Sequence, residues 1–157
     1  MTTAIRAALG ALLVLLMSLA LGAPAAQAEP SIRSATVADL YLRADKPSKD
    51  AVKRSFAAFM NPSLPMGPKL EVSVNGAANR GELQRMMDQS RQHDFFSMKG
   101  DVVAVNVSGN AMNARFQGSM AGFPVQSFTY YYVRQGGLWK YDWKHNAAAN
   151  GMPAKFV

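Results

Sequence analysis

The chain has 157 residues, no cysteine, only two histidines and a formal net charge of +7 at neutral pH. The absence of cysteine excludes disulfide staples, thiol chemistry and thiolate metal centres. Two histidines also disfavour a multi-histidine zinc site, so we expect neither a metal nor a cofactor. The basic residues are spread thinly and form no basic arm, so nucleic acid is not an expected partner.

The first 28 residues are typical of a cleavable export signal. Arg6 is their only charged residue, an apolar run extends from Leu9 to Leu21, and Ala26-Gln27-Ala28 has the small-x-small pattern that signal peptidase accepts. Sec-type export with cleavage between Ala28 and Glu29 predicts a periplasmic or secreted protein that keeps no stable membrane anchor. The alternative is that the uncharged run is retained and anchors the protein in the membrane.

Residues 29–157 are predicted to form one domain. Removal of the signal takes away one basic residue and no acidic one, which leaves 129 residues with a formal charge of +6. A chain of this length can bury one hydrophobic core, and without disulfides it depends on that core for its stability.

The first half of this domain has a helical periodicity that is interrupted by turns. We expect helices over residues 36–44, 49–60 and 81–93, a short strand over 70–74 and a loop over 61–68. Ser48 is a favourable N-cap for the second helix, whose apolar stripe includes Phe56 and Phe59. The three prolines of the 61–68 segment disfavour both a helix and an interior strand.

The second half alternates between apolar and polar residues, which predicts an antiparallel sheet. The expected strands are 101–108, 111–120, 124–134 and 138–146, with turns at 109–110, 121–123 and 135–137. A turn centred on Gln135-Gly136 would place Tyr132 opposite Trp139 and Tyr130 opposite Tyr141. One face would then carry six aromatic side chains that stabilise each other across the strands: Phe128, Tyr130, Tyr132, Trp139, Tyr141 and Trp143.

This order of helices, short strand, helix and four long strands resembles the NTF2-like superfamily, which has a cystatin-like α+β fold. The segment from Tyr131 to Trp143 looks like its closing hairpin, with an aromatic-rich strand, a glycine turn and a second strand that contains Trp139-Lys140. Val74-Asn75-Gly76 followed by Gly81-Glu82-Leu83 is similar to its strand-to-helix entry. The resemblance implies N-terminal helices packed on a strongly curved antiparallel sheet, a cone with a ligand pocket at its open end, and a homodimer formed through the outer sheet face.

The resemblance also directs attention to groups that enzymes of this superfamily use for acid–base chemistry. The candidate catalytic residues are His93 and Asp94, at the end of the third predicted helix, together with Tyr41. The alternative for His93 is a histidine that interacts favourably with a helix C-terminus. His145 either reaches the cone or lies on the surface.

The leading hypothesis is an exported, non-catalytic binding module. The six aromatic residues above would bind a small apolar or aromatic molecule, or a protein partner, in the cone or on the sheet surface. The alternative for most of them is that they pack in the core. One alternative is an isomerase, dehydratase or hydrolase with its site in the cone. Another is an assembly component of the cell envelope or of a secretion system.

Overall fold

The computed structural model describes residues 34–92, 99–119 and 124–157. The export signal, the candidates His93 and Asp94, and the predicted turn at 121–123 lie outside the described residues. The predictions made for them therefore stay predictions.

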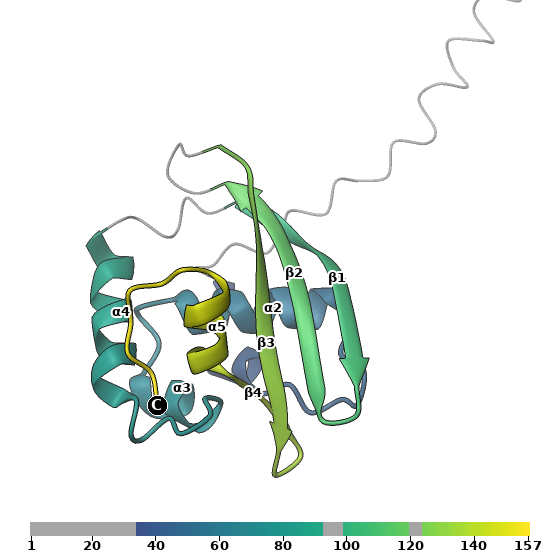
Figure 1. Ribbon diagram of the computed structural model, residues 1–157, viewed down its shortest axis with the longest axis horizontal. Coiled ribbons are helices and arrows are strands. Elements are labelled where there is room, and N and C mark those ends of the chain that lie inside the picture. Colours follow the sequence, from purple (N-terminus) through teal and green to yellow (C-terminus); the bar gives the residue numbers. More distant parts are fainter. Residues whose placement is uncertain (1–33, 93–98, 120–123) are drawn as a thin grey trace, which may run out of the picture.

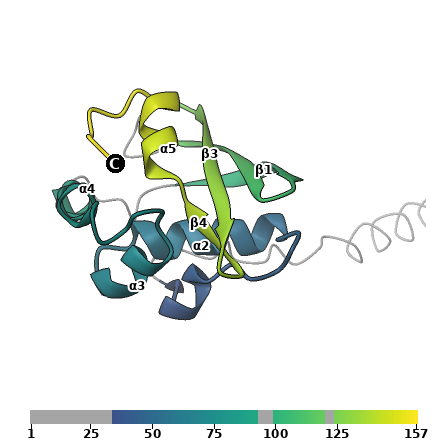
Figure 2. The same cartoon turned by 60° about the horizontal axis from the view of Figure 1, so that its bottom comes forward.

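The α+β fold class is confirmed, because helices precede a four-stranded antiparallel sheet with the strand order β1-β2-β3-β4 (Figure 1). In chain order the elements are η2 (Val37–Leu40), α2 (Lys49–Met60), α3 (Met66–Glu71), α4 (Arg80–Gln92), β1 (Lys99–Ser108), β2 (Ala111–Ser119), β3 (Gln126–Gln135), β4 (Leu138–Tyr141) and α5 (Trp143–Ala149). Helix α2 crosses one face of the sheet (Figure 2). No helix in the described part of the chain is long and apolar enough to cross a membrane.

Helix α2 has the predicted boundaries. The Ser48 side chain accepts a hydrogen bond from the Ala51 N–H at 3.1 Å, which satisfies one of the donors that the first helical turn leaves unpaired. The predicted apolar stripe is buried and includes Val52, Phe56 and Phe59. This helix supplies the surface on which the sheet packs.

The predicted helix over 36–44 is wrong, because only the short 3-10 turn η2 forms. The following residues are extended instead, and their carbonyl groups contact the last strand. The Leu42 carbonyl accepts the Trp139 backbone N–H at 3.0 Å, and the Ala44 carbonyl accepts the indole N–H of Trp139 at 2.9 Å. These tertiary hydrogen bonds cover the outer edge of β4 and favour an extended chain over a helix.

The loop predicted over 61–68 is confirmed only for residues 61–65, and the strand predicted over 70–74 is wrong, since α3 occupies Met66–Glu71. Pro68 is the third residue of this helix, where a backbone N–H has no partner within the helix, so the missing proline N–H costs no hydrogen bond. Of the predicted strand only Ser73 pairs, in a single parallel bridge with Tyr141.

Helix α4 begins one residue before its predicted start and buries Leu83, Met87 and Ser90 on the expected side. Asn79 precedes it, and its side chain binds Val157 through two hydrogen bonds. The Val157 N–H donates to Asn79 Oδ1 at 2.8 Å, and Asn79 Nδ2 donates to the Val157 carbonyl at 3.1 Å. The end of the described chain is thereby held against the start of α4.

The final strand is shorter than predicted, because β4 ends at Tyr141 and α5 follows. Asp142 is the N-cap of α5 and accepts the His145 N–H at 3.0 Å. Asn146 then binds the backbone of β3, where a longer β4 would have paired. Its Oδ1 accepts the Tyr131 N–H at 2.6 Å and its Nδ2 donates to the Tyr131 carbonyl at 3.2 Å.

The predicted register of the last hairpin is wrong by two residues. Gly136 and Gly137 have positive φ values of 59° and 75° and form the two-residue turn between β3 and β4. With this turn, Tyr132 lies opposite Tyr141 and not opposite Trp139. A shift of two residues preserves the alternation of faces, so the aromatic side chains of both strands still point to the core. The predicted register would also place Phe128 opposite Trp143, but this pair does not form, because Trp143 belongs to α5.

Candidate functional site

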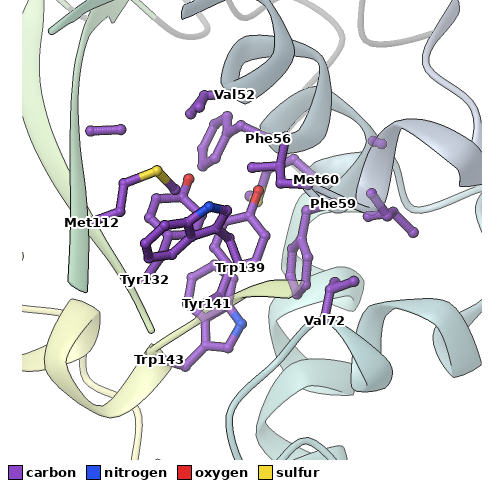
Figure 3. Close-up of a cluster of buried hydrophobic side chains, with 14 of the residues drawn as sticks. Val52, Phe56, Phe59, Met60, Val72, Met112, Tyr132, Trp139, Tyr141 and Trp143 are labelled. Atoms are coloured by element: carbon purple, nitrogen blue, oxygen red, sulfur yellow. The ribbon is translucent and has the colours of Figure 1, made fainter. Parts of the chain in front are cut away.

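Four of the six predicted ligand-binding aromatics are fully packed in the core (Figure 3). Tyr132, Trp139, Tyr141 and Trp143 are each at most 1% exposed. Phe59 of α2 contacts two of them, with ring centroids 4.6 Å from Tyr141 and 4.8 Å from Trp143. Any site on this face of the sheet would therefore have these rings at its base.

The polar atoms of these four residues have partners with one exception. Besides the indole of Trp139, the indole N–H of Trp143 donates to Ser73 Oγ at 3.1 Å, and the Tyr141 hydroxyl shares a hydrogen bond of 3.2 Å with Ser55 Oγ. The Tyr132 hydroxyl is enclosed and interacts with the neighbouring Tyr141, but it makes no hydrogen bond of ordinary length and geometry with the described residues. A buried hydroxyl without such a hydrogen bond is rare in proteins and is often a place where water or a ligand binds.

Three tyrosines on this face of the sheet, Tyr130, Tyr132 and Tyr141, are hydrogen-bond donors at neutral pH. Burial raises the pKa of Tyr130 to about 12. Burial also raises the pKa of Tyr132, to which the neighbouring Tyr141 adds, and burial raises the pKa of Tyr141 itself. Each hydroxyl therefore keeps its proton and is a poor general base.

The remaining two predicted aromatics, Phe128 and Tyr130, lie in the first half of β3, which pairs with β2. Phe128 is 38% exposed and lies directly opposite Phe116, which together with Tyr130 is partly buried. The centroids of Phe116 and Tyr130 are 5.4 Å apart, and Phe56 contacts both rings at 4.6 and 4.8 Å. We call Phe116, Phe128 and Tyr130 the hairpin-end patch.

The hairpin-end patch is continuous with the buried rings. Tyr130 contacts Trp143 edge to face, at a centroid separation of 6.1 Å, and Trp143 stacks on Tyr141 at 5.1 Å. A row of aromatic contacts thus extends from Phe116 and Tyr130 into the centre of the core, and the exposed Phe128 lies opposite Phe116 at its outer end.

The candidate Tyr41 is held near the surface by Glu71. Its hydroxyl donates to Glu71 Oε2 at 2.8 Å, and this hydrogen bond, followed by desolvation, raises the pKa of Tyr41. The Arg43 guanidinium lies 5.7 Å from the centre of its ring. Whether His93 and Asp94 approach Tyr41 is not tested, because both lie outside the described residues.

Lys69 is a feature that the sequence did not reveal. Its side chain is fully buried, and Nζ donates to the Asn61 carbonyl at 2.5 Å and to Met87 Sδ at 3.0 Å. Burial, with the nearby Arg91 as a second cause, lowers the pKa of Lys69 to about 8. The only sequence signal was its position beside Leu70 in an apolar segment, which was interpreted as a loop and a strand.

The other face of the sheet has a groove of about 190 Å³ that the sequence analysis also missed. We call it the outer groove; apolar residues of β1, β2 and β3 contribute to its lining, and its polar lining residues are Asn106, Ser108, Asn113, Tyr131, Asp142 and His145. His145 is exposed and stacks on Tyr131 at 3.8 Å with an interplanar angle of 9°, so it lies on the surface and not in the core. Asn106 Nδ2 donates to Asn113 Oδ1 at 3.1 Å.

Comparison with protein families found a match to the family described as the low molecular weight antigen MTB12, C-terminal domain, over residues 45–147. No curated protein and no solved structure matches the chain. The resemblance to the NTF2-like superfamily therefore stays a prediction. The family match extends from just before α2 into α5 and covers most of the chain, so the chain belongs to the family of the low molecular weight antigen MTB12, C-terminal domain.

Proposed function

We propose that this protein is an exported, non-catalytic binding module that takes an apolar molecule, or an apolar segment of a protein, at the hairpin-end patch. The observation that carries the proposal is the 38% exposure of Phe128, which lies opposite Phe116 at the outer end of the row of aromatic contacts. A single exposed apolar residue is ordinary, but one that continues a packed cluster offers a partner more apolar area than its own ring.

The energetics favour an apolar partner over a charged one. Each Å² of apolar surface removed from water contributes about 25 cal/mol, and aromatic rings add stability when they pack edge to face. The patch itself contains two phenylalanines and a tyrosine whose burial raises its pKa to about 12, so it presents no charge at neutral pH. A flat aromatic or aliphatic group fits this chemistry.

Three observations support a non-catalytic role. The tyrosines of the described core are protonated donors at neutral pH. Lys69, whose pKa is about 8, has its Nζ enclosed by Asn61 and Met87 and faces no site for a substrate. The family description names an antigen and no reaction.

A titration with Nile red, a neutral apolar dye, tests the proposal. We expect the dye to fluoresce on binding the wild-type protein and the Phe128→Ser variant to bind it at least about tenfold more weakly, because the exposed ring is lost. Val157→Ser is the matched control, since Val157 is 59% exposed and lies outside the patch. Equal binding by wild type and Phe128→Ser would show that the patch is not the site.

A further inference from the structure

The outer groove lies on the sheet face opposite the hairpin-end patch, and its lining combines apolar surface with a row of polar side chains. The strand register places Asn106 opposite Asn113 and Asn113 opposite Tyr131, so these three side chains share one face across β1, β2 and β3. The start of α5 adds Asp142 and His145 at the side of this row.

One wall of the outer groove is a stacked pair of rings. His145 lies almost parallel to Tyr131 at 3.8 Å, and the backbone of Tyr131 is fixed by its two hydrogen bonds to Asn146. Because the N-cap bond from the His145 N–H to Asp142 also fixes the first turn of α5, the stack is preorganised before any ligand arrives. A preformed flat wall suits a ligand that has a flat, weakly polar face.

The opposite part of the groove carries side-chain amides with unused hydrogen-bonding capacity. Each asparagine has two N–H donors and an oxygen that accepts twice, and the single bond between Asn106 and Asn113 uses one donor and one acceptor. Asp142 adds carboxylate oxygens, one of which already accepts the His145 N–H. Donors and acceptors therefore lie side by side within a space of about 190 Å³.

The side chains that line the outer groove determine which class of ligand it can bind. None of the described residues that line the groove is Lys or Arg, so nothing there compensates the charge of a phosphate or a carboxylate. Hydroxyl groups donate and accept at the same time, which matches neighbouring amides and a carboxylate. We propose that the outer groove binds a neutral sugar ring, with a carbon face against the Tyr131–His145 stack and hydroxyls on Asn106, Asn113 and Asp142.

The test is a titration of the whole protein followed by two-dimensional amide NMR. The probes are glucose, mannose, galactose, N-acetylglucosamine, maltose and cellobiose, with a phosphorylated glucose as the anionic comparison. We expect at least one neutral sugar at millimolar concentration to shift the amide signals of Asn113, Tyr131 and His145 and to leave Phe128 unchanged.

Single substitutions test which side chains of the groove bind the sugar. Asn113→Ala should weaken sugar binding about tenfold because it removes the central amide, and Tyr131→Ala should weaken it similarly because it removes the stack. Arg115→Ala is the control, since Arg115 lies two residues further along β2 on the same face and outside the groove. Each spectrum also reports whether the variant is folded, and Asn106→Ala replaces any variant that is not.

Three results would overturn the proposal: no shift with any neutral sugar, unchanged affinity in both Asn113→Ala and Tyr131→Ala, or binding of the phosphorylated glucose alone. The proposal does not depend on the hairpin-end patch. Sugar binding should therefore persist in Phe128→Ser, and failure of either proposal leaves the other standing.

Discussion

Tyr132 and Tyr141 are neighbouring core tyrosines that differ in one respect, since only the Tyr141 hydroxyl makes a hydrogen bond of ordinary length and geometry with the described residues. Tyr132→Phe should raise the free energy of unfolding by about 1 kcal/mol, because it removes a buried unpaired hydroxyl. Tyr141→Phe should lower it by about 1 kcal/mol, because it removes the bond to Ser55. Urea denaturation measures both. If Tyr132→Phe is as destabilising as Tyr141→Phe, the Tyr132 hydroxyl binds a water, a ligand or a residue outside the described part of the chain.

Lys69 makes stability depend on pH. Its folded-state pKa of about 8 is below the ordinary value of 10.5, so the unfolded chain binds more protons between these two values. The free energy of unfolding should therefore gain a contribution as the pH rises from about 8 to about 10.5, and lose it as the pH falls back. In Lys69→Met this contribution should vanish, whereas in Lys144→Met, an exposed control on α5, it should remain.

The measurement is a set of urea denaturations across this pH range, with the difference between variant and wild type taken at each pH. The difference cancels the titration of the tyrosines, which the two proteins share. A difference that stays constant across the range would mean that Lys69 does not titrate as its burial implies. The Asn61 carbonyl keeps the Leu64 N–H at 3.2 Å, so Lys69→Met leaves it with a partner.

At the scale of elements, α5 protects the edge of β3 with side-chain amides. Asn146 is fully buried and binds both backbone groups of Tyr131, while Asn150 Nδ2 donates to the Thr129 carbonyl at 2.9 Å. Asn146→Ala should lower the free energy of unfolding by about 1–3 kcal/mol, because it leaves the Tyr131 N–H without its described partner. Lys144→Ala, on the exposed side of the same helix, should change it little, by about 0.5 kcal/mol or less. Equal effects of the two changes in thermal or urea denaturation would refute this role for Asn146.

The elements that the sequence predicted well are those specified by local chemistry. Ser48 and the apolar stripe fix both ends and the buried face of α2, and the alternation of residues locates β1, β2 and β3 to within two residues. The failures occur where distant contacts decide. Leu42 and Ala44 are not helical because Trp139 binds their carbonyls. The chain after Tyr141 becomes a helix because Asp142 is an N-cap, whereas the sequence pattern predicts a strand there.

The predictions for the candidate site succeed where local pattern decides and fail where distant contacts decide. Alternation predicted that the aromatic side chains of β3 and β4 share a face, and a register error of two residues left that inference intact. The alternation of faces does not distinguish Tyr132, which is 1% exposed, from Phe128, which is 38% exposed. The sequence did not predict the outer groove, because the groove forms only where the start of α5 lies near Asn113. The start of α5 was predicted to be part of a strand.

At the scale of the whole molecule, export and assembly are tested by mass. We expect the exported protein to begin at Glu29, because the small residues before it match the signal peptidase pattern. Denaturing mass spectrometry of the secreted or periplasmic protein gives the first residue, and the same sample under native conditions gives the oligomeric state, for which we expect a homodimer. A mass that includes residues 1–28 would favour the retained anchor, and a native monomer would contradict the dimer.

The central claim is that an apolar group binds at the hairpin-end patch. Its most direct test is amide NMR of the wild-type protein titrated with benzyl alcohol, a small neutral aromatic probe. We expect the largest saturable shifts in the amide signals of Phe116, Phe128 and Tyr130, and unchanged signals for Asn113 and His145 of the outer groove. Shifts that fall elsewhere, or no saturable shift at all, would contradict it.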